Sequence, residues 1–249
     1  MRARFHQAGQ SAWLLGPLAV CFSTMLLVAH ATHRPWSGAG IILFAAGVTA
    51  AYALDYWADQ PTRRPQSILL LAAFATLAGF TAAWMLPGWK ILLAAALGTV
   101  GLAYRHWKKW PLMKTFLVAG AWTLAGVSFP VQWDARDLLL APFGGALLAV
   151  FASGALLCDL KDDEADTRAG VRTAVVLWGR RPAAILAGAL AVGGVLAALA
   201  ADRRGLAGAG LALATLAVFP KVAAQPILGP ALVDAALALP AVLILAGLA

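Results

Sequence analysis

The chain has 249 residues, of which 62% are hydrophobic and 12% are charged, and its mean hydropathy is +0.81. This composition excludes a soluble globular enzyme and predicts a protein made mostly of membrane-spanning segments. The net charge of +8 does not indicate nucleic-acid binding, because the chain has no polar domain that could carry a basic patch. Lysine and arginine residues that flank membrane spans and set their orientation explain the excess.

Nine apolar stretches follow one another along the chain. A transmembrane helix needs about 20 mostly apolar residues. The stretches fall at residues 12–31, 38–58, 67–86, 88–104, 114–131, 137–158, 182–201, 205–220 and 231–249. The spans must be helices, because lipid offers no hydrogen-bond partners to an open backbone. We therefore expect an all-α, polytopic membrane protein with nine transmembrane helices, which form a single domain over residues 1–249.

The distribution of basic residues predicts the orientation of these spans. If the N-terminus lies inside, the inner segments hold 14 of the 19 Lys and Arg residues. Positively charged loops favour the cytoplasmic side of a membrane. We expect an integral protein of a bacterial or archaeal inner membrane, with its N-terminus in the cytoplasm and its C-terminus outside.

Two groups of acidic residues interrupt the apolar pattern. Five carboxylates fall within the eight residues from Asp159 to Asp166. Asp55 and Asp59 form a second pair at the end of another apolar stretch, so that the two groups hold seven of the eleven acids. Residues three or four positions apart share one face of a helix. Asp159, Asp162 and Asp166 should therefore form one acidic stripe.

Basic segments accompany both acidic groups on the predicted cytoplasmic side. They are residues 60–65, 104–111 and 167–173. Clustered carboxylates repel one another and attract cations, and Mg²⁺ prefers oxygen ligands and shares its coordination shell with substrate phosphates. A solvated acidic loop is the simpler interpretation of one such group. Two acidic groups with bases between them favour a metal that bridges carboxylates to a diphosphate.

The segment from Asp159 to Thr173 resembles the second aspartate motif of the UbiA family of intramembrane prenyltransferases. That motif has the pattern Asn-Asp-x-x-Asp-x-Glu-x-Asp, followed by a basic stretch, a glycine, a basic residue and a threonine. The first motif of the family resembles Asp55, Asp59 and Arg64-Pro65 in this chain. Tyr104 and Lys108 are similar to a tyrosine–lysine element of the family. The resemblance covers nearly the whole chain, including the plan of nine helices.

The resemblance implies a Mg²⁺-dependent enzyme. It would transfer a prenyl group from a prenyl diphosphate to an aromatic or other lipid-soluble acceptor at the cytoplasmic side of the membrane. The implied catalytic and metal-binding residues are Asp55, Asp59, Asp159, Asp162 and Asp166, which would hold two Mg²⁺ ions. The implied diphosphate-binding residues are Arg64, Tyr104, Lys108, Lys161 and Arg172. The implied partners are the prenyl diphosphate, a hydrophobic acceptor and membrane lipid, and no nucleic acid.

Two positions depart from the family pattern. Ala51 and Cys158 stand where the motifs have asparagines. They leave open a second hypothesis, in which a divergent or inactive UbiA-like protein binds isoprenoids or a partner. A cation-binding transporter is a third hypothesis, but its acids would lie near the middle of the bilayer, whereas these lie at the ends of spans.

The spans themselves contain further polar and aromatic residues. Asp234 opens the last apolar stretch, and we expect it to pair with Lys221 outside the site. The glycine pair Gly193-Gly194 is expected to form helix contacts. The aromatic residues that could shelter an allylic cation are Tyr52, Tyr56, Trp57, Tyr104 and Trp122.

Overall fold

The computed structural model describes residues 14–59, 65–133 and 144–248 and shows an all-α protein. The long helices of these ranges are α2 (Leu15–Thr32), α3 (Gly38–Asp59), α4 (Gln66–Ala83), α5 (Gly88–Trp107), α6 (Met113–Ser128), α8 (Gly144–Ala169), α10 (Arg180–Ala200), α11 (Arg204–Val218) and α13 (Leu228–Leu245). Two short helices, α9 (Ala174–Trp178) and α12 (Pro220–Ala223), precede α10 and α13.

Each predicted span corresponds to one long helix. By length and composition, six of the described helices are able to cross a membrane: α2, α3, α4, α8, α10 and α13. α6 and α11 are shorter, with 16 and 15 residues. The count of nine transmembrane helices therefore stays a prediction. One boundary differs from the prediction. α8 continues past residue 158 to Ala169, so the acidic stripe lies on a regular helix.

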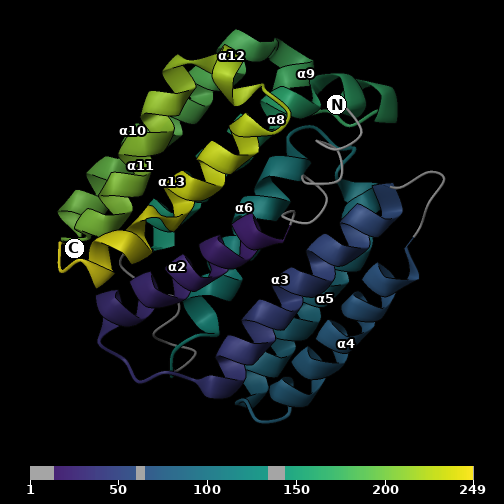
Figure 1. Cartoon of the computed structure of the whole chain (residues 1–249), viewed down its shortest axis with the longest axis vertical. Helices are drawn as coiled ribbons and strands as arrows, with labels where there is room; N and C mark the ends of the chain where they lie inside the picture. Colours follow the sequence, from purple (N-terminus) through teal and green to yellow (C-terminus); the bar gives the residue numbers. More distant parts are fainter. Residues whose placement is uncertain (1–13, 60–64, 134–143, 249) are drawn as a thin grey trace.

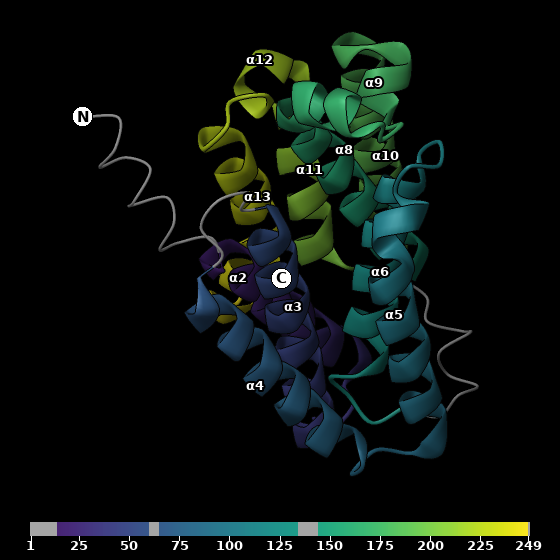
Figure 2. The same ribbon diagram turned by 90° about the vertical axis from the view of Figure 1, so that its right-hand side faces the viewer.

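The long helices pack as a closed ring in the order of the chain. Each helix contacts the next one, and α13 contacts α2 to close the ring. Figure 1 shows α10, α11 and α13 on one side, α3, α4 and α5 on the other, and α2 and α6 between them. Successive helices alternate in direction, so the connections that follow α5, α8 and α11 lie at one end. Figure 2 shows α9 and α12 together at that end.

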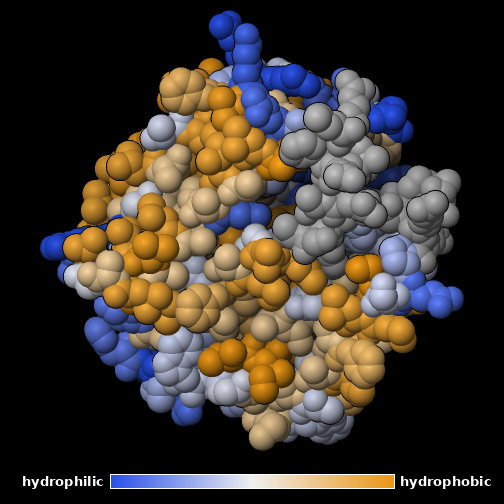
Figure 3. Space-filling view, viewed as in Figure 1, coloured by the Kyte–Doolittle hydropathy of each residue, from blue (hydrophilic) through white to orange (hydrophobic). Residues whose placement is uncertain are grey.

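The outer surface of the ring is apolar. Large hydrophobic side chains of α4, such as Phe74, Leu77 and Phe80, are exposed. Figure 3 shows apolar residues over most of one face and hydrophilic residues mainly toward its edges. Soluble proteins rarely expose contiguous apolar patches of this extent, whereas a surface that faces lipid requires them. The protein is an integral membrane protein.

Small residues let the helices around α8 approach closely. A Cβ atom added at Gly194 of α10 would lie 2.8 Å from Val150 Cγ2 of α8, and one at Gly210 of α11 would lie 2.8 Å from Val195 Cγ2. Glycine at such positions allows close packing of membrane helices. Gly193, in contrast, has no neighbour within 4 Å of an added Cβ. The expected helix contact is therefore formed by Gly194 and not by Gly193.

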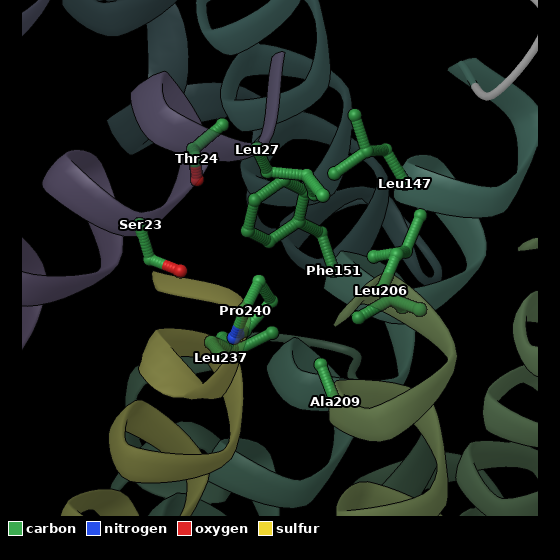
Figure 4. Close-up of a pocket in the computed structure, with 10 residues that line it drawn as sticks. Ser23, Thr24, Leu27, Leu147, Phe151, Leu206, Ala209, Leu237 and Pro240 are labelled. Carbon is green, nitrogen blue, oxygen red and sulfur yellow. The ribbon is translucent and has the colours of Figure 1, made fainter. Parts of the chain in front are cut away.

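A proline inside α13 is accommodated by a bond between helices. Pro240 cannot donate a backbone hydrogen bond, and the next residue, Ala241, donates its N–H to Ser23 Oγ of α2 at 3.2 Å. A cavity of about 10 Å³ adjoins this contact, lined by Ser23, Pro240, Phe151 and others (Figure 4). Such a volume is about that of one water molecule, so the cavity does not hold an isoprenoid.

The Gly193-Gly194 pair provides a matched test of the packing. We expect Gly194→Ala to destabilise the protein by about 1–3 kcal/mol, because the new methyl group overlaps Val150. Gly193→Ala adds the same methyl group in open space and should raise helix stability by up to about 1 kcal/mol. Thermal unfolding of both variants in one detergent checks the difference. Equal melting temperatures would contradict the close α8–α10 contact.

Candidate functional site

The acidic stripe of α8 is paired with a lysine from α6. The ammonium Nζ of Lys114 lies 3.0 Å from Asp159 Oδ1, 3.5 Å from Asp162 Oδ2 and 2.8 Å from Asp166 Oδ2. Asp159 and Asp166 are buried, and the Lys114 side chain is only 17% exposed. Buried or half-buried carboxylates require such partners, since an unpaired charge in a low-dielectric surrounding is costly. Lys114 thus compensates the charge that three aspartates concentrate on one face.

Further bonds fix the position of Lys114. Its neighbour Thr115 donates its hydroxyl to Asp159 Oδ2 at 3.2 Å. The connection that precedes α6 is tied to the connection that follows α8, because the Leu112 N–H donates to the Arg172 carbonyl at 2.9 Å. The start of α6 is therefore held against the end of α8 by side-chain and backbone bonds together.

A glycine ends α8 directly after the acidic stripe. Gly170 has a φ of +70°, a conformation that glycine adopts without strain. This turn lets the Val171 N–H donate to the Asp166 carbonyl at 2.9 Å, a bond typical of helix C-termini. Thr173 then caps α9 by accepting a bond from the Val176 N–H. The turn brings the carbonyl of Arg172 to the α5–α6 connection.

Tyr104, near the end of α5, connects the two acidic groups. Its phenol lies within electrostatic reach of groups on three other helices: Asp55 of α3, Lys114 of α6, and Asp159 and Asp166 of α8. Lys108 lies one turn further on, with its Nζ 5.3 Å from the centre of the Tyr104 ring. Tyr104 thus lies near Asp55 as well as near the α8 stripe.

The other predicted site residues have different surroundings. Lys161 forms an ion pair with its neighbour Asp162, with 2.7 Å between Nζ and Oδ1. Arg172 is exposed at the turn after α8. The backbone of Asp59 ends α3, but its side chain and the whole of Arg64 lie outside the residues that the structure describes.

Asp234 lies near the predicted site residue Lys161. This is contrary to the expectation that it would pair with Lys221. Its carboxylate interacts with the Lys161 ammonium. It also lies within electrostatic reach of Tyr52 on α3 and Cys158 on α8. Gly16 of α2 makes room for it, because a Cβ there would overlap the Asp234 carboxylate. The expectation was wrong because α13 turns this face toward the inside of the ring.

Aromatic side chains lie further into the bundle. The ring of Trp122 on α6 stacks on Phe151 of α8 at 5.6 Å and meets Phe44 of α3 edge to face at 5.7 Å. Its indole also lies close to the Tyr52 hydroxyl. Trp122 follows Lys114 by eight residues, which corresponds to about 12 Å along a helix. An apolar ligand with a charged head at Lys114 would therefore meet these rings with its tail.

The donor atoms of this site suit a hard cation, but a lysine already lies among them. Carboxylate oxygens are the ligands that Mg²⁺ prefers. Within the described residues, however, no three His, Cys, Asp or Glu side chains come together in a group that could hold a metal ion. Lys114 lies between the carboxylates of α8. Asp55 of α3 lies near Tyr104 and is on a different helix from this stripe.

The described helices and contacts define an all-α membrane bundle whose α6–α8 junction gathers acidic and basic groups at one end. A family model identifies the class of this bundle. The model of the UbiA prenyltransferase family matches residues 60–239. The chain belongs to that family, and the predicted resemblance to the family is confirmed. The matched range begins directly after Asp59, so the first acidic pair lies outside it. No curated protein matches the sequence.

The fold is similar to solved structures of a UbiA homolog from Archaeoglobus fulgidus. The structure bound to DMAPP and Mg²⁺ is 15% identical, with a TM-score of 0.59, over 93% of this chain and 97% of that one. The structure bound to GPP and Mg²⁺ is also 15% identical, with a TM-score of 0.60, over 93% and 98%. A third, bound to Cd²⁺, is 18% identical, with a TM-score of 0.60, over 93% and 97%. These similarities show that the fold is shared.

Sequence reasoning missed Lys114, Thr115 and Asp234 for different reasons. In the sequence, Lys114 is one of the basic residues that predict the orientation of the spans, and nothing nearby marks it as a site residue. Thr115 has no neighbours in the sequence that mark it as polar and buried. Asp234 offered a signal, since a carboxylate inside an apolar stretch usually faces a protein interior.

Thr115 offers a test of the α6–α8 junction. We expect Thr115→Val to destabilise the protein by about 1.5–3 kcal/mol, because a bond to a charged carboxylate is lost. Thr123→Val is the matched control, since the Thr123 hydroxyl bonds only to the Ala119 carbonyl of its own helix. Thermal unfolding of the two isosteric variants should show the larger loss at residue 115. A loss of similar size at both positions would argue against the inter-helix bond.

Proposed function

We propose that the protein transfers a prenyl group from a prenyl diphosphate to an aromatic or other lipid-soluble acceptor in a Mg²⁺-dependent reaction. The observation that carries this proposal is the placement of Tyr104, which lies within electrostatic reach of Asp55 and of the α8 stripe. A site with carboxylates on two sides, bases around it and an apolar interior beneath suits a diphosphate with an isoprenoid tail. Membership of the UbiA family and the ligands named for the Archaeoglobus homolog support it.

The proposed roles follow from the chemistry of each group. Asp55, Asp59 and the carboxylates of α8 would hold Mg²⁺, which stabilises the negative charge that grows on a diphosphate as it leaves. Arg64, Lys108 and Arg172 would bind phosphate oxygens, as arginine and lysine do. Lys161 and Tyr104 would complete the site around the diphosphate.

The chain's apolar and aromatic residues would govern the rest of the reaction. Departure of the diphosphate leaves an allylic cation, which the acceptor then attacks. The faces of Trp122 and Phe151 carry negative electrostatic potential that favours a nearby cation and exclude water that would quench it. These rings lie deeper than Lys114, where the first part of the tail would pass. The partners are then the prenyl diphosphate, the hydrophobic acceptor and the surrounding lipid.

A second candidate function is isoprenoid binding without catalysis. Ala51 and Cys158 favour it, because both replace an amide oxygen donor of the family motifs. Cys158 presents a thiol directly beside Asp159, and Mg²⁺ binds oxygen in preference to sulfur. Binding of labelled GPP with no release of diphosphate, at any Mg²⁺ concentration, would decide for this function.

Two aspartates that lie one turn of α8 apart, Asp159 and Asp163, allow a sharp test of catalysis. We expect Asp159→Asn to lower the rate of diphosphate release from labelled GPP by at least about 10²-fold, the usual effect of losing an electrostatic stabiliser. Asp163→Asn should change the rate little, because Asp163 faces Arg180 in an exposed ion pair, and such pairs contribute little. The assay follows release of diphosphate with Mg²⁺ and a membrane lipid extract that supplies the acceptor, so the acceptor need not be identified beforehand. Equal rates in both variants would contradict the assignment.

We further propose that this end of the ring faces the cytoplasm and that the N-terminus is cytoplasmic. A reporter that is active only outside, such as alkaline phosphatase, should be active when fused after Ala249. It should be inactive when fused after Lys109, in the basic α5–α6 connection. Activity in the opposite arrangement would refute the orientation that the basic residues predict.

A further inference from the structure

We propose that Asp234 selects the acceptor: it accepts a hydrogen bond from a hydroxyl group of a neutral acceptor and repels acceptors that carry a carboxylate or a phosphate. This inference rests on the proposed function and names the chemical class of its second substrate. Asp234 is in this view a specificity-determining residue, which contacts the acceptor and has no part in binding the diphosphate.

The packing of α13 against α8 sets the position of Asp234. A Cβ atom added at Gly154 of α8 would lie 3.3 Å from Val233 Cγ1 and 3.2 Å from Leu237 Cδ1 of α13. α8 ends and α13 begins at the end of the ring where α9 and α12 lie (Figure 2), so the two helices run in opposite directions. One turn further along α8, Cys158 comes opposite the turn of α13 that carries Asp234, and these two side chains interact.

Three further helices contribute to the surroundings of this carboxylate. Tyr52 of α3 lies within electrostatic reach of Asp234 and close to Trp122 of α6. Gly16 of α2 leaves room for the carboxylate, which a Cβ atom there would overlap. Tyr52 therefore links Asp234 to the aromatic rings beside which the allylic carbon would lie. An acceptor has to approach that carbon to about 3–3.5 Å, and Asp234 lies on the side of α8 away from α6.

The Asp234 carboxylate has hydrogen-bonding capacity to spare. The three carboxylates of the α8 stripe each accept a side-chain hydrogen bond, but none of the residues that the structure describes donates one to Asp234. An ionised carboxylate has sites for about four hydrogen bonds, and a half-buried one that lacks them is costly. Carboxylates within membrane helices usually serve a function. A hydroxyl group of a bound acceptor is a donor that would satisfy this one.

Charge decides between neutral and acidic acceptors. The cation that attracts Asp234 is Lys161, and its ammonium already lies 2.7 Å from Asp162 Oδ1. Two carboxylates thus share the positive charge of Lys161. A carboxylate or phosphate on the acceptor would be placed beside a like charge, which is unfavourable, whereas a hydroxyl group would gain a charge-assisted hydrogen bond. We therefore expect a phenol or an alcohol as the acceptor.

The test separates a membrane lipid extract into a neutral and an acidic fraction by anion exchange. Each fraction is incubated with the protein, Mg²⁺ and labelled GPP, and the label transferred to lipid is counted after unreacted GPP is removed. We expect wild type to label the neutral fraction at least about tenfold more than the acidic one. Asp234→Asn keeps an accepting oxygen but loses the charge, so the ratio of neutral to acidic label should fall by at least about tenfold.

Asp163→Asn is the matched control, because it removes a carboxylate of the exposed ion pair with Arg180 at the same end of the ring. Its ratio of neutral to acidic label should equal that of wild type. A carboxylate that only pairs with Lys161 would affect the labelling of both fractions alike. An unchanged ratio in Asp234→Asn would therefore overturn the proposal, and so would preferential labelling of acidic lipid by wild type.

Gly16→Ala covers the case in which Asp234→Asn does not fold. The new methyl group keeps the charge but displaces the carboxylate, so labelling of neutral lipid should fall by at least about tenfold, with unchanged binding of a non-reactive thio analogue of GPP. Labelling equal to that of wild type would overturn the proposal. Failure of the proposed function looks different, since wild type then labels neither fraction and releases no diphosphate, and both proposals fall. Label in acidic lipid alone would overturn only the role of Asp234.

Discussion

Lipid offers no hydrogen-bond partners to the backbone, and the architecture of this protein depends on that constraint. Every long segment must be a helix, and each helix must present an apolar outer face. Association of the helices cannot rely on the hydrophobic effect between surfaces that are apolar on both sides, so it relies on close packing. The contact of Gly194 with Val150 is an example. Charged groups are then confined to the ends of the helices or to the inside of the ring.

At one end of the ring, this confinement brings several charged side chains close together. The stripe on α8 and the lysine on α6 stabilise each other, because Asp159 and Asp166 are buried and a buried charge requires an opposite charge beside it. The same contacts join α6 to α8, so the site and the fold share one set of interactions. Removing a carboxylate would thus act on both charge and packing, which is why matched controls such as Asp163 are needed.

The sequence predicted the features that depend on local pattern. The spacing of Asp159, Asp162 and Asp166 placed them on one helical face, and the apolar stretches placed the helices. The resemblance to the UbiA family, which the motifs suggested, was confirmed by the family match. Contacts between helices were not predictable in this way. Lys114 meets Asp159 across 45 positions of sequence, and nothing local distinguishes it from the lysines that merely set orientation. Asp234 was misplaced because the sequence does not reveal which face of α13 turns inward.

The fold and the site have different tolerances to change. The Archaeoglobus homolog shares the fold at 15% identity, because many combinations of small and apolar residues satisfy the same helix packing. The charge balance at the site depends on few groups, because the three carboxylates of α8 share the ammonium group of Lys114. A chain of this family is therefore able to keep its helices through many substitutions, whereas the charged contacts between α6 and α8 tolerate fewer.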